Sequence, residues 1–432
     1  MPDLDWSEQA IGDIFRINTA SVLPNTFPRS LFYHHSLPAW DECGGPLVEP
    51  GISIESNKTA LKVPCVLVSK LNPRKPRVSA VTNIPDDQNH CASTEFVCLE
   101  PATDSIPLSF WHHFFSHKQF SNRLDRVAIG STNSHKRYGP RELLSFRIST
   151  PSVAEQEVIA QIFDTLDTQI QKSEALIAKL EKIKEGLLFD LLTRGIDQDG
   201  QLRPTLEQAP ELYKKSALGL IPKEWHKGAI SDYLLQNGGI KPGPFGSSIT
   251  KNMYRSKGYK IYGQEQVIRS DHTFGDYYID RNKYSELIDF SVQSRDILIS
   301  LVGTIGKVLI IPTGHERGII NPRLMRLRPN QNACDSEFLS HVLTSTFFTR
   351  KLTALAGGGT MPVINKRIVQ SVALPVIPLV EQSAIRSKIS SLLGKLANEK
   401  AILAKLRAQK SGLMDDLLTG RVRVTPLLKD AV

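Results

Sequence analysis

Four polar residues in the second half of the chain have side chains that could recognise the edges of nucleic-acid bases. They are Gln264, Gln266, Asn321 and Arg323. A carboxamide can form two hydrogen bonds with adenine, and a guanidinium can form two with guanine. The same residue types also make ordinary surface and structural hydrogen bonds, so none of them establishes this role by itself.

A loop of small and rigid residues, KPGPFGSS at 241–248, precedes these four residues. Its backbone amides, Lys241 and Ser247 could approach phosphates while Phe245 packs at a base step. Lys251 and Arg255 follow and add positive charge. An ordinary turn would use the same glycine and proline residues, so the loop supports two interpretations.

Two basic clusters stand out in the first half of the chain, where residues 1–150 otherwise balance 15 basic against 15 acidic side chains. One surrounds Pro73 and the other follows a Gly-Ser-Thr loop. Such clusters can contact phosphates, although solvated surface is the commoner explanation. Their members are Lys70, Arg74, Lys75 and Arg77, and His135, Lys136, Arg137 and Arg141.

Motifs for catalysis are missing. The segment GTIGKV at 303–308 lacks the spacing of a phosphate-binding loop. Asn321-Pro322-Arg323-Leu324 begins like an amino-methyltransferase signature, but its last two residues break that signature. No glycine-rich loop follows a strand to hold S-adenosylmethionine. The five cysteines contain no CxxC pair, which argues against structural zinc and favours a reducing cytoplasm. We therefore expect a chain without catalysis, metal or cofactor of its own.

The elements that must position these residues occur twice. Residues 155–193 align without a gap on residues 381–419, and each copy carries an apolar residue every three or four positions. This spacing predicts a coiled coil, with each helix roughly 60 Å long. Two unrelated surface helices are the alternative, but the seams and their polar interruptions match in register. The predicted seam residues are Ile159, Phe163, Leu166, Leu180 and Leu187, and Ile385, Ile389, Leu392, Leu406 and Leu413.

The repeat continues outside the helices. Trp6 matches Trp225, and Leu99, Phe110 and His113 match residues 228 positions later. We therefore predict an α+β protein with two mixed domains, two long antiparallel helices and an internal pseudo-two-fold repeat. The expected layout is domain 1 at 1–150, a helix at 151–194, a linker at 195–222, domain 2 at 223–377, a helix at 378–421 and a frayed tail at 422–432.

Within the domains, short β-rich runs are bounded by Gly, Pro and Asn. One further helix is expected in each domain, at 107–125 and 335–355. Each domain then ends in a small-residue loop, at 130–132 and 357–360. The predicted β-rich runs are 46–54, 62–71, 77–83 and 95–99, and 259–268, 276–279, 296–301, 305–311 and 319–328.

In this order, these features resemble the specificity (S) subunits of type I restriction–modification systems. The resemblance covers nearly the whole chain. It rests on the duplicated Glu-Gln-x-x-Ile helix starts, the Asp-Leu-Leu-Thr helix ends, RGIDQDGQLRP at 194–204, SALGLIPKEW at 216–225, Asp296-Ile297-Leu298 and Asn321-Pro322-Arg323. The first half departs from the pattern, because it has no GTIGK-like segment and no Asn-Pro-Arg.

The resemblance implies that each domain recognises one half of a bipartite double-stranded DNA target. It also implies that the helices dock two modification subunits that bind S-adenosylmethionine and methylate adenine. Restriction subunits with ATP- and Mg-dependent motor and nuclease domains would join them. Separately from the resemblance, no stretch reaches the length needed to span a membrane, so we expect a cytoplasmic protein without membrane contact. Two rival hypotheses remain: a coiled-coil adaptor that binds only protein, and a stand-alone DNA methyltransferase.

Overall fold

The computed structural model describes residues 6–300, 306–355 and 365–429. The chain forms two compact units, one of Met1–Glu174 with Ala401–Val432 and the other of Ala175–Lys400. Helices α6 (Val153–Thr193) and α12 (Leu379–Leu417) each contribute one part to each unit. We call these the discontinuous unit and the continuous unit. No helix of the described residues is long and apolar enough to cross a membrane.

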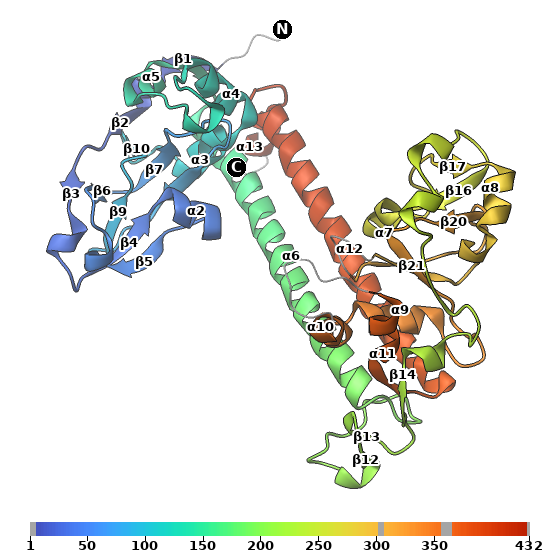
Figure 1. Ribbon diagram of the computed structural model, residues 1–432. Helices are drawn as coiled ribbons and strands as arrows, with labels where there is room; N and C mark the ends of the chain where they lie inside the picture. The colour runs from blue at the N-terminus through green and yellow to red at the C-terminus, as the bar shows by residue number, and fades with distance from the viewer. Residues whose placement is uncertain (1–5, 301–305, 356–364, 430–432) are drawn as a thin grey trace. The chain divides into compact units, whose positions relative to one another are not determined.

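The N-terminal domain, in the discontinuous unit, contains two sheets of four and five strands (Figure 1). The central strand of the first, β7, has the apolar sequence CVLVS and is buried along its whole length. That sheet has the order β2 (Phe15–Ile17), β10 (Phe96–Pro101), β7 (Cys65–Ser69), β8 (Val78–Val81). The second has the order β3 (Ser21–Val22), β6 (Lys58–Leu61), β9 (Asn89–Ala92), β4 (Leu31–His35), β5 (Leu47–Pro50).

The second domain, in the continuous unit, repeats this plan with shorter strands. Its four-stranded sheet has the order β15 (Ile240–Pro242), β21 (Leu324–Leu327), β18 (Ile297–Ser300), β19 (Val308–Ile310). Its other sheet has the order β17 (Tyr278–Ile279), β16 (Tyr259–Tyr262), β20 (Gly318–Ile320). In both domains the second sheet contains one parallel strand pair, β4 with β9 or β16 with β20. The internal repeat therefore extends to strand order.

Short helices complete each domain, and they correct two expectations. The predicted helices 107–125 and 335–355 are each broken in two, at His117 and at Ser345, which are 228 positions apart. Ser345 has extended backbone, and its hydroxyl accepts a hydrogen bond from the Phe348 amide, so it starts a new helix. The pairs are α3 (Leu108–Ser116) with α4 (Lys118–Val127), and α9 (Ser336–Thr344) with α10 (Thr346–Leu355).

The predicted run 259–268 is also only partly a strand, because Gln264–Arg269 forms helix α7. Helix α2 (Leu37–Cys43) occupies the same place in the N-terminal domain, after β4. Helices α1 (Ile11–Ile14), α5 (Pro140–Ser145), α8 (Arg281–Glu286) and α11 (Lys366–Ser371) are the remaining short α-helices of the described domains. Each domain is closed by an antiparallel pair, β1 (Ser7–Ala10) with β11 (Arg147–Thr150), or β14 (His226–Ala229) with β22 (Ala373–Val376). The loop predicted at 357–360 lies outside the described residues.

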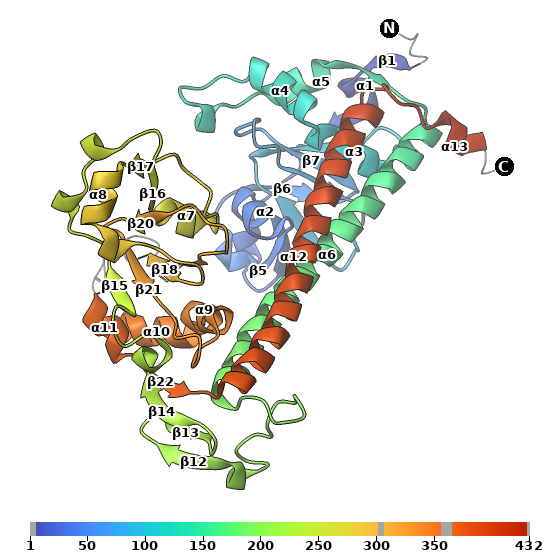
Figure 2. The ribbon, with the colours of Figure 1, turned by 90° about the vertical axis from the view of Figure 1, so that its right-hand side faces the viewer.

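Within each unit, α6 and α12 lie side by side and run in opposite directions (Figures 1 and 2). In the discontinuous unit, Lys410 Nζ lies 2.6 Å from an Asp167 oxygen, and the Arg407 guanidinium lies 2.6 Å from a Glu174 oxygen. In the continuous unit, Lys400 Nζ lies 2.8 Å from a Glu181 oxygen. All ten predicted seam residues are buried or half-buried. The expected fold class, two mixed domains with two long antiparallel helices, is confirmed.

A buried cluster around Glu381 fixes the start of α12 in the continuous unit. Its carboxylate accepts hydrogen bonds from Arg203, from the Trp225 indole at 2.9 Å and from the Ile196 amide at 2.8 Å. The Arg203 and Glu381 side chains are each 9% exposed. Gly195 lies against the side chains of Glu381, Arg203 and Trp225, so any side chain at position 195 would collide with them. The segment predicted as a linker is therefore packed into the unit, and it includes the hairpin β12 (Tyr213–Ser216)–β13 (Gly219–Pro222).

Glu155 has the corresponding position at the start of α6 in the discontinuous unit. It accepts hydrogen bonds from the Arg423 guanidinium, at 2.9 and 3.0 Å, and from the Thr425 hydroxyl. Val424 is buried, and helix α13 (Thr425–Lys429) follows. The expectation of a frayed tail was therefore wrong for residues 422–429. Arg423 thus donates hydrogen bonds to Glu155 at the start of α6, as Arg203 does to Glu381 at the start of α12.

Candidate nucleic-acid interface

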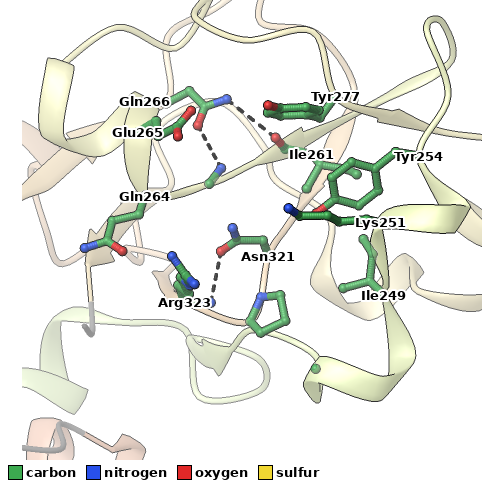
Figure 3. Close-up of a pocket in the computed structure, with 13 residues that line it drawn as sticks. Ile249, Lys251, Tyr254, Ile261, Gln264, Glu265, Gln266, Tyr277, Asn321 and Arg323 are labelled. Atoms are coloured by element: carbon green, nitrogen blue, oxygen red, sulfur yellow. Dashed lines mark hydrogen bonds between the residues drawn. The ribbon is translucent and has the colours of Figure 1, made fainter. Parts of the chain in front are cut away.

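In the second domain, four parts of the chain line one cavity of about 860 Å³ (Figure 3). They are the region 246–254, the end of β16 with the start of α7, Tyr277, and the turn 321–323, which follows β20. Five of the residues predicted to contact DNA line this cavity: Lys251, Gln264, Gln266, Asn321 and Arg323. The structure thus brings together most of the motifs that the sequence presented separately.

Two glycines permit this convergence. A Cβ atom on Gly243 would lie 1.9 Å from the Asn321 carbonyl oxygen, so only glycine allows the KPGPFGSS loop to pack on that turn. Its amide donates to the Leu324 carbonyl at 2.8 Å. A Cβ atom on Gly263 would lie 2.9 Å from the Asn321 side-chain nitrogen. Both glycines therefore hold the Asn321 turn close to its neighbours.

The predicted contact residues differ in how much of their hydrogen-bonding capacity remains for a ligand. Arg323 is exposed at the rim, and its amide donates to the Asn321 side-chain oxygen at 2.9 Å. Gln266 also lines the cavity but is only 3% exposed. Its carboxamide accepts from the Gly263 amide at 2.9 Å (Figure 3). It donates to the Phe274 carbonyl at 2.8 Å. Its contacts are those of an internal support for the cavity wall.

The remaining predicted residues of this domain lie around the cavity. Phe245 is 86% exposed, beside the lining residue Gly246, and Ser247 is also exposed. Lys241 pairs with Asp289 at 3.2 Å and lies over the Phe290 ring. Arg255 lies 3.8 Å from Asp280 and donates to backbone carbonyls, so it is partly committed to its own loop.

Two tyrosines that the sequence analysis missed form one wall of the cavity. The rings of Tyr254 and Tyr277 have centroids 5.3 Å apart, and Tyr277 is 51% exposed. Burial raises the pKa of the Tyr254 hydroxyl, which stays protonated at neutral pH. An aromatic face next to amide and cationic groups suits contact with bases. Tyr254, which lies among the basic residues of 251–260, was the available signal for one of them.

In the N-terminal domain, the structure joins the two basic clusters into one surface. Arg137 forms β-bridges with Leu71 and with Ile129, and the Asn72 amide donates to the Lys136 carbonyl at 2.9 Å. His135 is exposed in the same loop, and its Nδ1 lies 2.7 Å from the Thr132 hydroxyl. Two clusters more than fifty residues apart in sequence therefore form one basic edge.

Carboxylates pair with most cations of this basic edge, which the sequence did not predict. Asp125 lies 2.9 Å from Arg74 and 3.4 Å from Lys136. Asp41 contacts Lys75 and Arg77 at 2.7 and 2.8 Å, and Glu95 contacts Arg137 at 3.1 Å. The arginine partners hold the pKa of Asp41 and of Asp125 below the usual range. Counting Lys70 but not Arg141, which lies in α5, the edge contains six cationic side chains and these three carboxylates, so its net charge is +3.

The two candidate surfaces lie at the same corner of the shared domain plan. Glu95 directly precedes β10, and Arg323 directly precedes β21, its counterpart 228 residues later. Ser93-Thr94-Glu95 thus replaces Asn321-Pro322-Arg323. The described residues contain no group of three or more His, Cys, Asp and Glu side chains arranged to hold a metal ion. Part of the GTIGK segment, residues 303–305, lies outside the described residues.

A family model for the type I restriction modification DNA specificity domain matches residues 52–182 and 244–408. The MjaVIII type I restriction enzyme specificity subunit of Methanocaldococcus jannaschii is 25% identical over 291 residues, which are 66% of this chain and 64% of that protein. This match spans just under two thirds of the relative's length. The StySPI specificity subunit of Salmonella potsdam is 24% identical over 352 residues, 73% of this chain and 69% of that protein.

Two solved structures have a similar fold. One belongs to a study of complex assembly and conformational transition in a type I R-M system, with a TM-score of 0.58 at 16% identity, covering 96% of this chain and 98% of the other. The other is the type I S subunit from M. genitalium, with a TM-score of 0.56 at 14% identity, covering 96% and 97%.

Proposed function

This chain belongs to the family of type I restriction–modification DNA specificity proteins, and from that premise we propose that it recognises a bipartite DNA target, one half-site with each domain. The observation that carries this proposal is the repeated domain plan with different side chains at the same corner. One corner presents Tyr254, Tyr277, Asn321 and Arg323. The other presents arginines and lysines held by carboxylates. Two such different surfaces would select different base sequences.

We also propose that the chain is a non-catalytic targeting subunit. It would direct two modification subunits, which carry S-adenosylmethionine and methylate adenine, and restriction subunits, which carry ATP and Mg. The repeated frame supports two equivalent docking sites. Leu176 on α6 and Ile402 on α12 are 226 residues apart, and they are 43% and 40% exposed. What supports the proposal is the repetition: an apolar side chain exposed at the same position of both repeats would suit two copies of one partner.

Exchange of the N-terminal domain tests the two-reader proposal. Residues 12–145 would be replaced by the same region of a relative, which leaves α6, α12 and the second domain unchanged. Expressed with the modification partner, the hybrid is expected to methylate a motif that differs from the original in one half only. Mapping of methylated adenines across the host genome gives the result. A change in both halves, or in neither, would refute one reader per domain.

The rival hypotheses give different results in the same system. A coiled-coil adaptor would not retard DNA in a sequence-dependent manner, with or without its partner. A stand-alone methyltransferase would transfer a labelled methyl group to DNA when the purified chain is incubated with S-adenosylmethionine alone. The targeting subunit is expected to need the modification partner for this transfer.

Charge placed at the two repeated apolar positions tests the docking proposal. Leu176→Glu alone should remove one modification subunit, and Leu176→Glu with Ile402→Glu should remove both, because each glutamate must lose water on docking. Native mass spectrometry of the assembled complex counts the subunits. Ala178→Glu and Ala404→Glu are the matched controls, since both are exposed and project from the opposite side of their helices. Unchanged stoichiometry in the double variant would place docking elsewhere.

A further inference from the structure

Arg137, on the basic edge of the N-terminal domain, is held at both ends of its side chain. Its backbone amide and carbonyl pair with those of Ile129, at 2.9 and 2.8 Å. The neighbouring Tyr138 is buried, and its hydroxyl donates to the Ser69 carbonyl at 2.9 Å. At the tip, Nε and Nη2 each donate to one oxygen of Glu95 at 3.1 Å. The side chain is nevertheless 52% exposed.

This geometry leaves a specific edge of the guanidinium for a ligand. The group has five N–H donors in one plane, and Glu95 uses one on Nε and one on Nη2. The two parallel donors at the far end, one on each terminal nitrogen, point away from the carboxylate. Two parallel donors match the O6 and N7 acceptors that guanine presents in the major groove. A carboxylate that fixes the guanidinium plane also lowers the entropy lost on contact.

We propose that Arg137, positioned by Glu95, reads a guanine in the half-site of the N-terminal domain. This inference rests on the proposed function and extends it to one base and one residue. Glu95 has the place in this domain that Arg323 has in the other. In the second domain, the residue just before β21 would itself be the arginine, Arg323. In the N-terminal domain, the corresponding residue is Glu95, which would hold the arginine, Arg137.

The neighbouring arginines have geometries that suit other roles. Arg77 also donates Nε and Nη2 to a carboxylate, that of Asp41, but its side chain is only 11% exposed. Its Nη1 is buried and has no hydrogen-bond partner among the described residues, so it points into the domain. Arg74 is 51% exposed, but only its Nε contacts Asp125. Arg74 therefore has the exposure of Arg137 without the fixed plane, which suits a phosphate contact.

The experiment uses the full chain with its modification partner. The wild-type methylation motif is mapped first, and the domain exchange identifies the half-site of the N-terminal domain. Binding is then measured on duplexes in which each G·C pair of that half-site is changed in turn, and on duplexes carrying 7-deazaguanine, which lacks the N7 acceptor. The variants are Arg137→Lys, Arg137→Ala and Glu95→Gln, with Arg74→Lys as the matched control.

We expect wild-type complex to lose roughly 10- to 100-fold in affinity when one particular guanine is changed, as for a two-bond base contact. Arg137→Ala should bind the original and changed duplexes equally at that position and should no longer respond to 7-deazaguanine there. Arg137→Lys should keep the charge but lose most of the discrimination. Glu95→Gln should reduce discrimination at the same pair only. Arg74→Lys should leave discrimination unchanged.

Several results would overturn the inference. If the half-site of the N-terminal domain contains no G·C pair, Arg137 has no guanine to contact, and the inference is wrong. A loss of affinity that is uniform across sequences in Arg137→Ala would make this residue a phosphate contact. If discrimination stays at wild-type level in both Arg137 variants, another residue reads the guanine. These results leave one half-site per domain intact, whereas failure of wild-type complex to bind DNA specifically would refute the proposed function itself.

Discussion

Replacing Glu381 with alanine is expected to lower the free energy of unfolding of the continuous unit by about 3–5 kcal/mol. The carboxylate lies in a buried cluster and accepts hydrogen bonds from Arg203, Trp225 and the Ile196 amide. Without it, the Arg203 guanidinium, whose side chain is 9% exposed, loses its main counter-charge. The Trp225 indole, in a residue with no exposed surface, loses its acceptor as well.

Urea unfolding, with hydrogen exchange of residues 175–400 as a local readout, measures this loss. Glu337→Ala is the matched control, because Glu337 also pairs with an arginine, Arg386, near the start of α12 but is 57% exposed. That pair lies 3.5 Å apart at the surface and should contribute at most about 1 kcal/mol. A Glu381 variant as stable as the control would show that the cluster does not anchor α12.

Removing residues 421–432 is expected to lower the free energy of unfolding of the discontinuous unit by a comparable amount, about 3 kcal/mol or more. The truncation removes Arg423 and Thr425 from Glu155, whose side chain is 5% exposed, and it exposes the core beneath Val424. A carboxylate that remains buried without its cation is strongly destabilising. Hydrogen exchange in the first turns of α6 should accelerate most, because Glu155 lies there.

Arg421→Ala is the control for this truncation. Arg421 is 68% exposed and pairs only with Asp416 among the described residues, so its loss should change stability little. Arg423→Ala should reproduce most of the truncation effect by itself. If the truncated chain unfolds at the wild-type urea concentration, then residues 421–429 only cover the unit and do not stabilise it.

The long helices and the fold class were predictable because their signals are local and repeated. An apolar residue every three or four positions over five turns or more predicts a buried seam, and residues such as Phe163 and Ile385 are indeed fully buried. The internal repeat added a second, independent copy of the same signal. The breaks at His117 and Ser345 were not predicted, because both residues lie inside helical patterns. At Ser345 the cap is local, since its hydroxyl accepts a hydrogen bond from the Phe348 amide. His117 makes no capping hydrogen bond, and its ring contacts Asp415, 298 residues away, which the sequence could not show.

The sequence could indicate which residue types can form the candidate interface, but not which hydrogen-bond and ion-pair partners surround them in the fold. Composition marked Lys251, Asn321 and Arg323 as possible base or phosphate contacts, and these residues line one cavity. It did not show that the Gln266 carboxamide is used internally, nor that Asp41, Glu95 and Asp125 pair with the basic clusters. Those partners lie 11 to 51 residues away in sequence, and only the folded sheets bring them together.

The division of the two long helices between units sets an order for folding during synthesis. The continuous unit, Ala175–Lys400, is a single stretch of chain and can form once that stretch has left the ribosome. The discontinuous unit needs both ends of the chain, and its Glu155–Arg423 contact spans 268 residues. Until residues 401–424 emerge, Ile159 and Phe163 lack the Leu417 side of their core. The domain made first is therefore completed last, and its apolar helix face stays available to chaperones or to aggregation for most of translation.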